Sequence, residues 1–159
     1  MTQEEKDLLL KDLCSRLPYG VRYRHFTWND EYGETYIAAQ IYSINTDGYV
    51  KNCYDDETVY IDNVRPYLFP LSSMTEEEAK ELSILYGIKD ILSINITDEY
   101  IDFKIDDGFC SFERKTIWYN EIISSTETFD WLNKHHFDYR GLIEKGLALE
   151  APEEMYKTE

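Results

Sequence analysis

The amino-acid sequence predicts an α+β fold, in which an antiparallel sheet packs against a helical layer. Two observations carry this prediction. Asp-Gly turns at Asp47-Gly48 and Asp107-Gly108 join neighbouring strand-like segments, and such short turns make antiparallel hairpins. Signals of the Ser/Thr-x-x-Glu type, which begin helices, stand at Thr2, Thr75 and Ser124. The predicted order is therefore helix, strands, helix, strands and two final helices.

The first helix is expected from Thr2 to about Arg16, because Thr2 and Glu5 form a capping box and Pro18 stops the helix. Its spacing predicts a buried stripe of Leu9, Leu10, Leu13, Cys14 and Leu17. The same spacing predicts a solvated face made of Glu4, Lys6, Lys11 and Asp12.

Four strands are expected next, at residues 19–28, 34–44, 49–54 and 58–61. In the first strand, Tyr23 and Phe26 are both expected to point inward, although strict alternation would place them on opposite faces. This change in the alternation predicts a β-bulge between them. The second has no strongly polar face, so we expect it at the centre of the sheet, covered on both sides.

The middle of the chain repeats this order of helix and strands. Residues 65–71 are bracketed by prolines and predict an extended connector. Thr75 and Glu78 cap a helix that Gly87 ends. Strands are expected at residues 91–97, 100–105 and 109–119, the second with the cleanest alternation of the chain.

A helical hairpin over Ser124–Leu149 is expected to close the core. Phe129, Leu132 and His136 share one face of its first helix, and Asp138 can cap a second helix that contains Leu142. At 159 residues the chain fits a single domain, 1–159. Its last ten residues, 150–159, contain Pro152 and are expected to form a loosely held tail.

The charge of the chain limits its partners. Its 32 acidic and 16 basic residues give a net charge of −16, and the two-to-one excess recurs along the whole length. Such a chain is repelled by phosphate backbones and anionic membranes, so we expect neither nucleic acid nor membrane as a partner. A protein partner with a basic face is expected instead. Solubility alone is the competing explanation of the charge, and oligomeric state stays open.

Cysteine usage and hydropathy favour a cytoplasmic setting. Cys14, Cys53 and Cys110 are odd in number and far apart, which is typical of reduced thiols rather than disulfides or zinc ligands. The first residues lack the apolar core of a signal peptide, and no apolar run is long enough to span a membrane.

No catalytic, cofactor-binding or metal-binding motif is present in the sequence. The three histidines, His25, His135 and His136, lack a metal-ligand spacing, although His25 is free to meet one of the others in space. Asp doublets at 55–56 and 106–107 stand in predicted turns, where Asp is favoured for backbone reasons. We therefore assign no catalytic residue, cofactor or metal.

One helix carries candidate partner-binding residues. Trp131 and His135 lie at positions i and i+4, roughly opposite Phe129 and His136. A tryptophan on that side of an amphipathic helix either packs against a second element or is exposed for a partner. Together with Tyr139, these two side chains form the predicted binding site.

Three blocks of the sequence resemble a known family. The opening block DLCSRLPYGV (12–21), the central block RPYLFPLSSMTEEE (65–78) and the late block FDWLNKHHFDYRGLIEKGLAL (129–149) are similar to short acidic proteins encoded by gut Bacteroidales and by their phages and prophages. That family has no assigned activity, so the resemblance brings no functional residues. It implies a cytosolic setting and a role in the biology of mobile elements.

These observations predict a non-enzymatic, protein-binding accessory factor with an acidic surface and of phage or mobile-element origin. The alternative is a small hydrolase or nucleotide-handling enzyme whose site combines dispersed acids with His25, His135 or His136. A deep pocket with converging polar groups would support the enzyme, whereas an aromatic patch rimmed by acids would support the binding factor.

Overall fold

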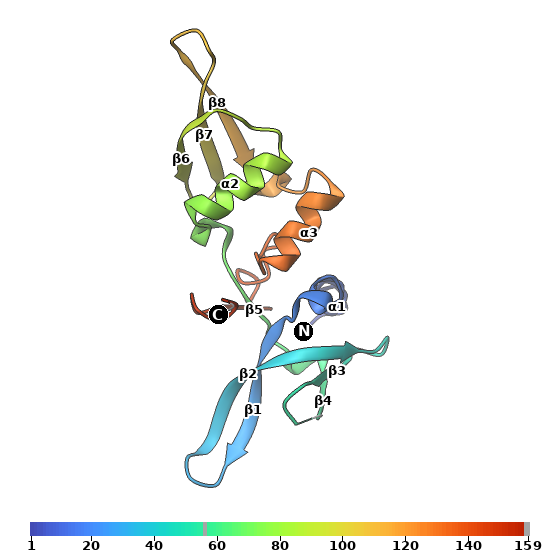
Figure 1. Cartoon of the computed structure of the whole chain (residues 1–159). Coiled ribbons are helices and arrows are strands. Elements are labelled where there is room, and N and C mark those ends of the chain that lie inside the picture. Colours follow the sequence, from blue (N-terminus) through green and yellow to red (C-terminus); the bar gives the residue numbers. More distant parts are fainter. Residues whose placement is uncertain (56, 158–159) are drawn as a thin grey trace. The chain divides into compact units, whose positions relative to one another are not determined.

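The computed structural model describes residues 1–55 and 57–157, and its chain forms two compact units (Figure 1). Unit 1 comprises Met1–Leu68 and Arg140–Glu159, and unit 2 comprises Phe69–Tyr139. Both combine α-helix with antiparallel strands, which confirms the α+β class. Each unit has its own hydrophobic cluster. Whether residues 1–159 nevertheless unfold as the single predicted domain stays a prediction.

Unit 1 is built from helix α1 (Gln3–Arg16) and a curled antiparallel sheet. The strands of the sheet, in their spatial order, are β1 (Arg22–Asn29), β2 (Gly33–Ile44), β3 (Tyr49–Asn52) and β4 (Thr58–Tyr60). Short 3₁₀ turns, η1 (Leu17–Tyr19) and η2 (Ile61–Asn63), follow α1 and β4. The sheet curls because β2 pairs with β1 along its first part and with β3 along its last.

Strand β2 is central, as predicted, but it is not covered on both faces. Tyr36 and Tyr42 on its outer face are exposed. The bulge predicted in the first strand is also wrong, because β1 pairs with β2 in continuous register. The irregularity lies in β2, between Ile41 and Ser43. Because the alternation along β1 is uninterrupted, Phe26 points outward, on the face opposite buried Tyr23 and His25.

Helix α1 begins at the predicted capping box of Thr2 and Glu5. Its buried side differs from the prediction, since Cys14 is exposed and Asp12 is fully buried. Asp12 accepts two hydrogen bonds from Arg16, whose Nε lies 2.8 Å and Nη2 3.0 Å from the carboxylate oxygens. Arg140 adds a third at 3.2 Å. Burial of the carboxylate is possible because two guanidinium groups neutralise it.

The C-terminal segment is hydrogen-bonded to unit 1. Strand β9 (Leu149–Glu150) runs parallel to β5 (Tyr67–Leu68). Beyond it, the Tyr156 hydroxyl accepts from the Arg22 N–H at 2.9 Å and donates to the Tyr67 carbonyl at 2.8 Å. These bonds give the predicted tail a docking point on the sheet. Its looseness stays a prediction.

Unit 2 has a three-stranded antiparallel sheet and two helices. Its helices are α2 (Glu76–Leu85), which Thr75 caps as predicted, and α3 (Thr126–Lys134). Its strands, adjacent in sequence order, are β6 (Ile91–Ile96), β7 (Tyr100–Asp106) and β8 (Phe112–Trp118). The 3₁₀ turns η3 (Leu71–Ser73) and η4 (Tyr119–Glu121) precede α2 and follow β8. Ile101 and Phe103 of β7 are fully buried, which confirms the alternation predicted there.

The predicted C-terminal helical hairpin is absent. Helix α3 is capped by Ser125 rather than Ser124, and it is the last helix of the described chain. His136 takes a left-handed conformation (φ 58°), and the backbone then pairs in extended form with Phe69. Phe69 N–H donates to the His136 carbonyl at 2.9 Å, and Asp138 N–H donates to the Phe69 carbonyl at 2.8 Å. The backbone of Asp138 therefore takes part in a strand-like pairing with Phe69, and Asp138 does not cap a helix.

The apolar residues of the predicted hairpin serve two different cores. Leu132 is fully buried in the cluster of unit 2, and Leu142 in the cluster of unit 1. Between Arg140 and Ala148 the chain forms turns, with left-handed backbone at Gly141 (φ 69°) and Gly146 (φ 72°). Two left-handed glycines so close together are incompatible with the predicted second helix.

Two further predictions concern cysteines and membranes. Cys14, Cys53 and Cys110 are all free and exposed, which confirms that they are unpaired. Within the described residues, none of the helices has the length and apolar character needed to cross a bilayer.

Candidate functional site

Strands β1 and β2 form a two-stranded ribbon (Figure 1), and one of its faces carries exposed aromatic side chains. Alternation along the strands places Phe26, Trp28 and Tyr36 on its outer face. We call these three side chains the aromatic face. Phe26 lies opposite Tyr36, with ring centroids 5.9 Å apart. The Arg24 guanidinium lies 5.0 Å from the centre of the Tyr36 ring and extends the surface by a cation–π contact.

These aromatic side chains remain open to solvent. Trp28 is 65% exposed, Tyr36 59% and Phe26 47%. Tyr32, in the turn that follows, is 76% exposed. Single exposed apolar residues are ordinary, but a contiguous group of large aromatic side chains marks an interaction surface.

Acidic side chains surround the end of the ribbon. Glu34 lies directly opposite Trp28 in the register, and Asp30 and Glu31 stand in the connecting turn. We call these three residues the acidic tip. The Asn29 carboxamide holds the turn by accepting from the N–H groups of Glu31 and Tyr32, at 2.8 and 3.2 Å. Within the described residues no ion pair involves the acidic tip.

The inner face of the same ribbon carries a buried polar network. The Asn52 amide donates to the Tyr23 hydroxyl at 3.0 Å, and that hydroxyl lies 2.9 Å from Nδ1 of His25. His25 Nε2 lies 2.8 Å from Oδ2 of Asp55. Tyr23 and Asn52 are fully buried, and His25 is 3% exposed. A directed chain follows, in which Asn52 donates to Tyr23, Tyr23 to His25 Nδ1, and His25 Nε2–H to Asp55.

The local environment shifts the pKa values of two groups in this network, the Tyr23 hydroxyl and the Asp55 carboxyl. Burial raises the pKa of the Tyr23 hydroxyl; the hydrogen bond from Asn52 opposes the rise, and the nearby charges of Asp55 and Glu57 add to it. The phenol therefore stays neutral and keeps its proton to donate. Partial desolvation of the Asp55 carboxyl raises its pKa, but hydrogen bonds from His25 and from the Glu57 N–H outweigh this and lower it.

His25, Asp55 and Glu57 form the one group of possible metal ligands found among the described residues. Their nearest ligand atoms all lie within 4.8 Å of one another. Asp55 belongs to an Asp doublet that the sequence analysis assigned to turn formation, and its partner Asp56 lies outside the described residues. His135 and His136 belong to unit 2, so a meeting of His25 with either of them stays a possibility from the sequence.

The sequence-predicted site of Trp131, His135 and Tyr139 lies in unit 2, and each of these side chains has contacts within that unit. Trp131 Nε1 donates to Glu81 at 3.1 Å, and its ring lies 4.3 Å from that of His135. Burial lowers the pKa of His135, which the Glu81 charge partly opposes. The Tyr139 hydroxyl donates to Asn133 at 2.8 Å.

These contacts favour the packing alternative for Trp131, whose side chain is half-buried against the core of unit 2. Trp131 and His135 lie together, whereas Tyr139 contacts Phe129, with ring centroids 5.8 Å apart. The partner-binding role of the three residues stays a prediction.

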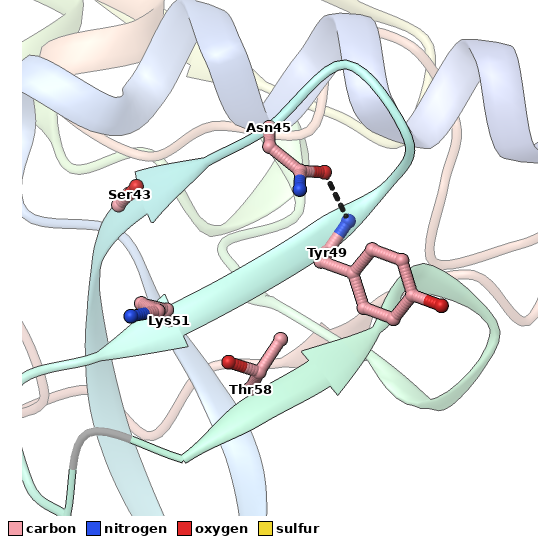
Figure 2. Close-up of a pocket in the computed structure, with 5 residues that line it drawn as sticks. All are labelled: Ser43, Asn45, Tyr49, Lys51 and Thr58. Atoms are coloured by element: carbon pink, nitrogen blue, oxygen red, sulfur yellow. Dashed lines mark hydrogen bonds between the residues drawn. The ribbon is translucent and has the colours of Figure 1, made fainter.

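An open pocket of about 350 Å³ lies on the outer face of β2, β3 and β4 (Figure 2). Ser43, Lys51 and Thr58 form a row across the three strands. Asn45 and Tyr49 complete the lining, where the Asn45 carboxamide accepts from the Tyr49 N–H at 2.9 Å. None of these five lining residues is a carboxylate or a histidine. The lining is polar and carries one cationic side chain, that of Lys51.

Sequence reasoning missed the aromatic face because it assigned Phe26 to the core. The alternating pattern Arg22, Arg24, Phe26, Trp28 already contained the signal, since the arginines mark the solvent-facing phase. An undisturbed alternation would have placed Phe26 and Trp28 outside with them.

Comparison of the chain with protein-family models, with curated proteins and with solved structures gives no match. Functional inference therefore depends on the geometry of the two units themselves.

Proposed function

We propose that the protein is a non-enzymatic accessory factor that binds a partner protein with a basic face through the β1–β2 ribbon. The observation that carries the proposal is the adjacency of the aromatic face (Phe26, Trp28, Tyr36) to the acidic tip (Asp30, Glu31, Glu34). An aromatic patch rimmed by acids is the surface expected of the binding factor rather than of the enzyme.

The two parts of this surface have different physical roles. Aromatic side chains supply most of the binding energy of protein interfaces, because they bury a large apolar area at a low cost in side-chain entropy. Carboxylates at the rim add less affinity but steer a positively charged partner and raise the association rate. Because the acidic tip has no ion pair within the described residues, its charge is available to a partner.

The ribbon is also held in shape before binding. β1 and β2 pair over eight residues, and their inner face is anchored by the network of Tyr23, His25 and Asn52. A preorganised surface loses less conformational entropy on association, which favours affinity. The resemblance to phage and prophage proteins supports a host protein, or another protein of the mobile element, as the partner.

Comparative capture from a host lysate tests the proposal. The full-length protein, Trp28→Ala and Trp118→Ala are immobilised in equal amounts, and bound proteins are identified by mass spectrometry. Trp118 is a matched control, because it is another strand tryptophan of the chain, 47% exposed, on β8. We expect a specific protein that the native chain and Trp118→Ala retain and that Trp28→Ala loses.

The captured protein is then purified for measurements of binding kinetics. Trp28→Ala should weaken its binding by about 30-fold or more, as expected for a hot-spot tryptophan. Replacing Asp30, Glu31 and Glu34 by their amides should slow association and reduce its dependence on salt. A partner that binds Trp28→Ala as tightly as the native chain would contradict the proposal, and loss of binding by Trp131→Ala alone would transfer the site to the predicted Trp131 cluster.

A further inference from the structure

We infer that His25, Asp55 and Glu57 of unit 1 form a binding site for a divalent first-row transition-metal ion such as Zn²⁺. This inference goes beyond the proposed protein-binding function and uses the opposite face of the ribbon. One histidine nitrogen and two carboxylates are a ligand set that zinc accepts.

The spacing of the three groups fits one ion. His25 Nε2 lies 2.8 Å from Oδ2 of Asp55 and 3.9 Å from Oε2 of Glu57. Ligand atoms placed 2.0–2.2 Å from a tetrahedral zinc ion are about 3.3–3.6 Å apart. The two observed distances lie on either side of that value, and the carboxylate oxygens lie within 4.8 Å of each other. Rotation of the partly exposed carboxylate side chains by about half an ångström or more would bring the three atoms to the spacing of one ion.

The histidine is held in the orientation that a metal ligand needs. Its Nδ1 faces the Tyr23 hydroxyl at 2.9 Å, and that hydroxyl is itself fixed by Asn52 at 3.0 Å. Metal-binding histidines usually donate from their second nitrogen to such a partner, which sets the tautomer and the ring orientation. Ion binding at Nε2 would move the imidazole proton from Nε2 to Nδ1 and reverse the hydrogen bond between His25 and Tyr23. Nδ1–H would then donate to the Tyr23 oxygen, which also accepts from Asn52.

The site has a closed protein side and an open solvent side. The side-chain exposures are 4% for His25, 26% for Asp55 and 68% for Glu57. An ion would therefore be held by three protein ligands and keep at least one position for water, which is the arrangement of an accessible rather than a closed zinc site.

Charge also favours a cation here. Two carboxylates face one imidazole, and within the described residues neither carboxylate has an ion pair with a lysine or arginine. A divalent ion would neutralise both. The imidazole ligand favours zinc or another transition metal over Mg²⁺ and Ca²⁺, which prefer oxygen ligands alone.

Isothermal titration of the full chain with ZnCl₂ in chelator-treated buffer tests the site. We expect one ion per chain. Glu57→Gln, at an exposed position where a folding defect is not expected, should weaken zinc binding by at least about tenfold. His25→Gln should abolish measurable binding, and circular dichroism will show whether this buried substitution still folds.

His135→Gln is the matched control. His135 also has a carboxylate neighbour, with Nε2 3.5 Å from Glu81, but it belongs to unit 2 and has no third ligand among the residues that the structure describes. This variant should bind zinc as the native chain does. Absence of zinc binding to the native chain would overturn the inference, as would unchanged affinity in Glu57→Gln. Loss of binding in His135→Gln would place the ion elsewhere and overturn it too.

Discussion

The β1–β2 and β7–β8 hairpins are both antiparallel ribbons, but their outer faces differ in how charge is used. On β7–β8, Arg114 lies 3.6 Å from Asp102, and the Lys104 ammonium lies 3.9 Å from the centre of the Phe112 ring. Three charged side chains of β7–β8, Asp102, Lys104 and Arg114, therefore have partners within the hairpin. On β1–β2 the acidic tip has no such partner among the described residues, and the aromatic face stays open. This contrast is consistent with the proposal that β1–β2 carries the protein-binding surface.

The inner faces differ as well. β7 and β8 bury apolar side chains, including Ile101, Phe103 and Ile117. β1 instead buries Tyr23 and His25, which need Asn52 and Asp55 as hydrogen-bond partners. A buried polar network is stable only when every member is satisfied, and it then defines one geometry more strictly than apolar packing does. Unit 1 therefore combines an open outer surface with a strictly defined inner one.

The largest expected change in stability comes from removing a buried charge in unit 1. Asp12→Asn removes the charge that neutralises Arg16 and Arg140, and should destabilise the protein by about 3–5 kcal/mol. Asp102→Asn in unit 2, whose partner Arg114 is mostly exposed, should cost less than about 1 kcal/mol. Urea denaturation measures both. Similar losses in the two variants would show that the buried ion pairs do not distinguish the units.

The second prediction separates the two cores. Leu142→Ala and Leu132→Ala each remove a fully buried side chain and should destabilise by about 2–5 kcal/mol. Amide hydrogen exchange should show faster opening in unit 1 for Leu142→Ala and in unit 2 for Leu132→Ala. Lys134→Ala, at an exposed position, should change stability by less than about 0.5 kcal/mol. Uniformly faster exchange along the whole chain in both variants would instead support the predicted single domain.

Sequence patterns correctly predicted the features that depend only on residues close together in the chain. The capping residues Thr2 and Thr75 act as expected, because a cap needs only its own helix turn. The strands near residues 34, 49, 58, 91 and 100 also follow from local alternation and Asp-Gly turns. These signals are contained within a few residues, so a single sequence is enough to read them.

The errors arose where distant segments decide the outcome. Asp12 is charged and was assigned to water, but Arg140, 128 residues away, supplies a neutralising partner. Asp138 was assigned to a helix cap, but Phe69 pairs with that backbone as a strand does. The site residues of unit 1 also depend on segments distant in sequence. The curl of the sheet brings Asn52 to Tyr23 and Asp55 to His25. No local pattern contains that information.

A smaller effect is expected at alkaline pH. Burial raises the pKa of Tyr156 from 10.0 to about 12, although the Arg22 N–H and the charges of Arg16 and Arg22 oppose the rise. A raised folded-state pKa means that the neutral phenol stabilises the fold. This contribution is complete below about pH 10 and is lost as the pH rises towards 12, by on the order of 2 kcal/mol.

Tyr156→Phe checks this assignment. The variant loses the hydrogen bond to the Tyr67 carbonyl at every pH, but it should show a shallower fall in stability between pH 10 and 12 than the native chain. Tyr119, whose pKa burial also raises to about 12, provides the counterpart in unit 2. Identical alkaline profiles for the native chain and Tyr156→Phe would show that the docking of the C-terminal segment does not depend on this phenol.

The smallest expected effect is an absence of nucleic-acid binding, which tests whether the open surface of unit 1 is specific for a protein. The ribbon carries two arginines that could contact phosphate, Arg22 and Arg24 of β1. Arg24 already contacts the Tyr36 ring, and the acidic tip lies on the same ribbon. Two arginines beside three carboxylates cannot release enough counterions to hold a phosphate backbone.

We therefore expect no retardation of mixed DNA and RNA oligonucleotides in a gel shift at micromolar protein and about 50 mM salt, a condition that favours such binding. Retardation that Arg24→Ala abolishes and Trp118→Ala preserves would contradict this prediction, and would make the ribbon a nucleic-acid surface on which Trp28 and Tyr36 stack with bases.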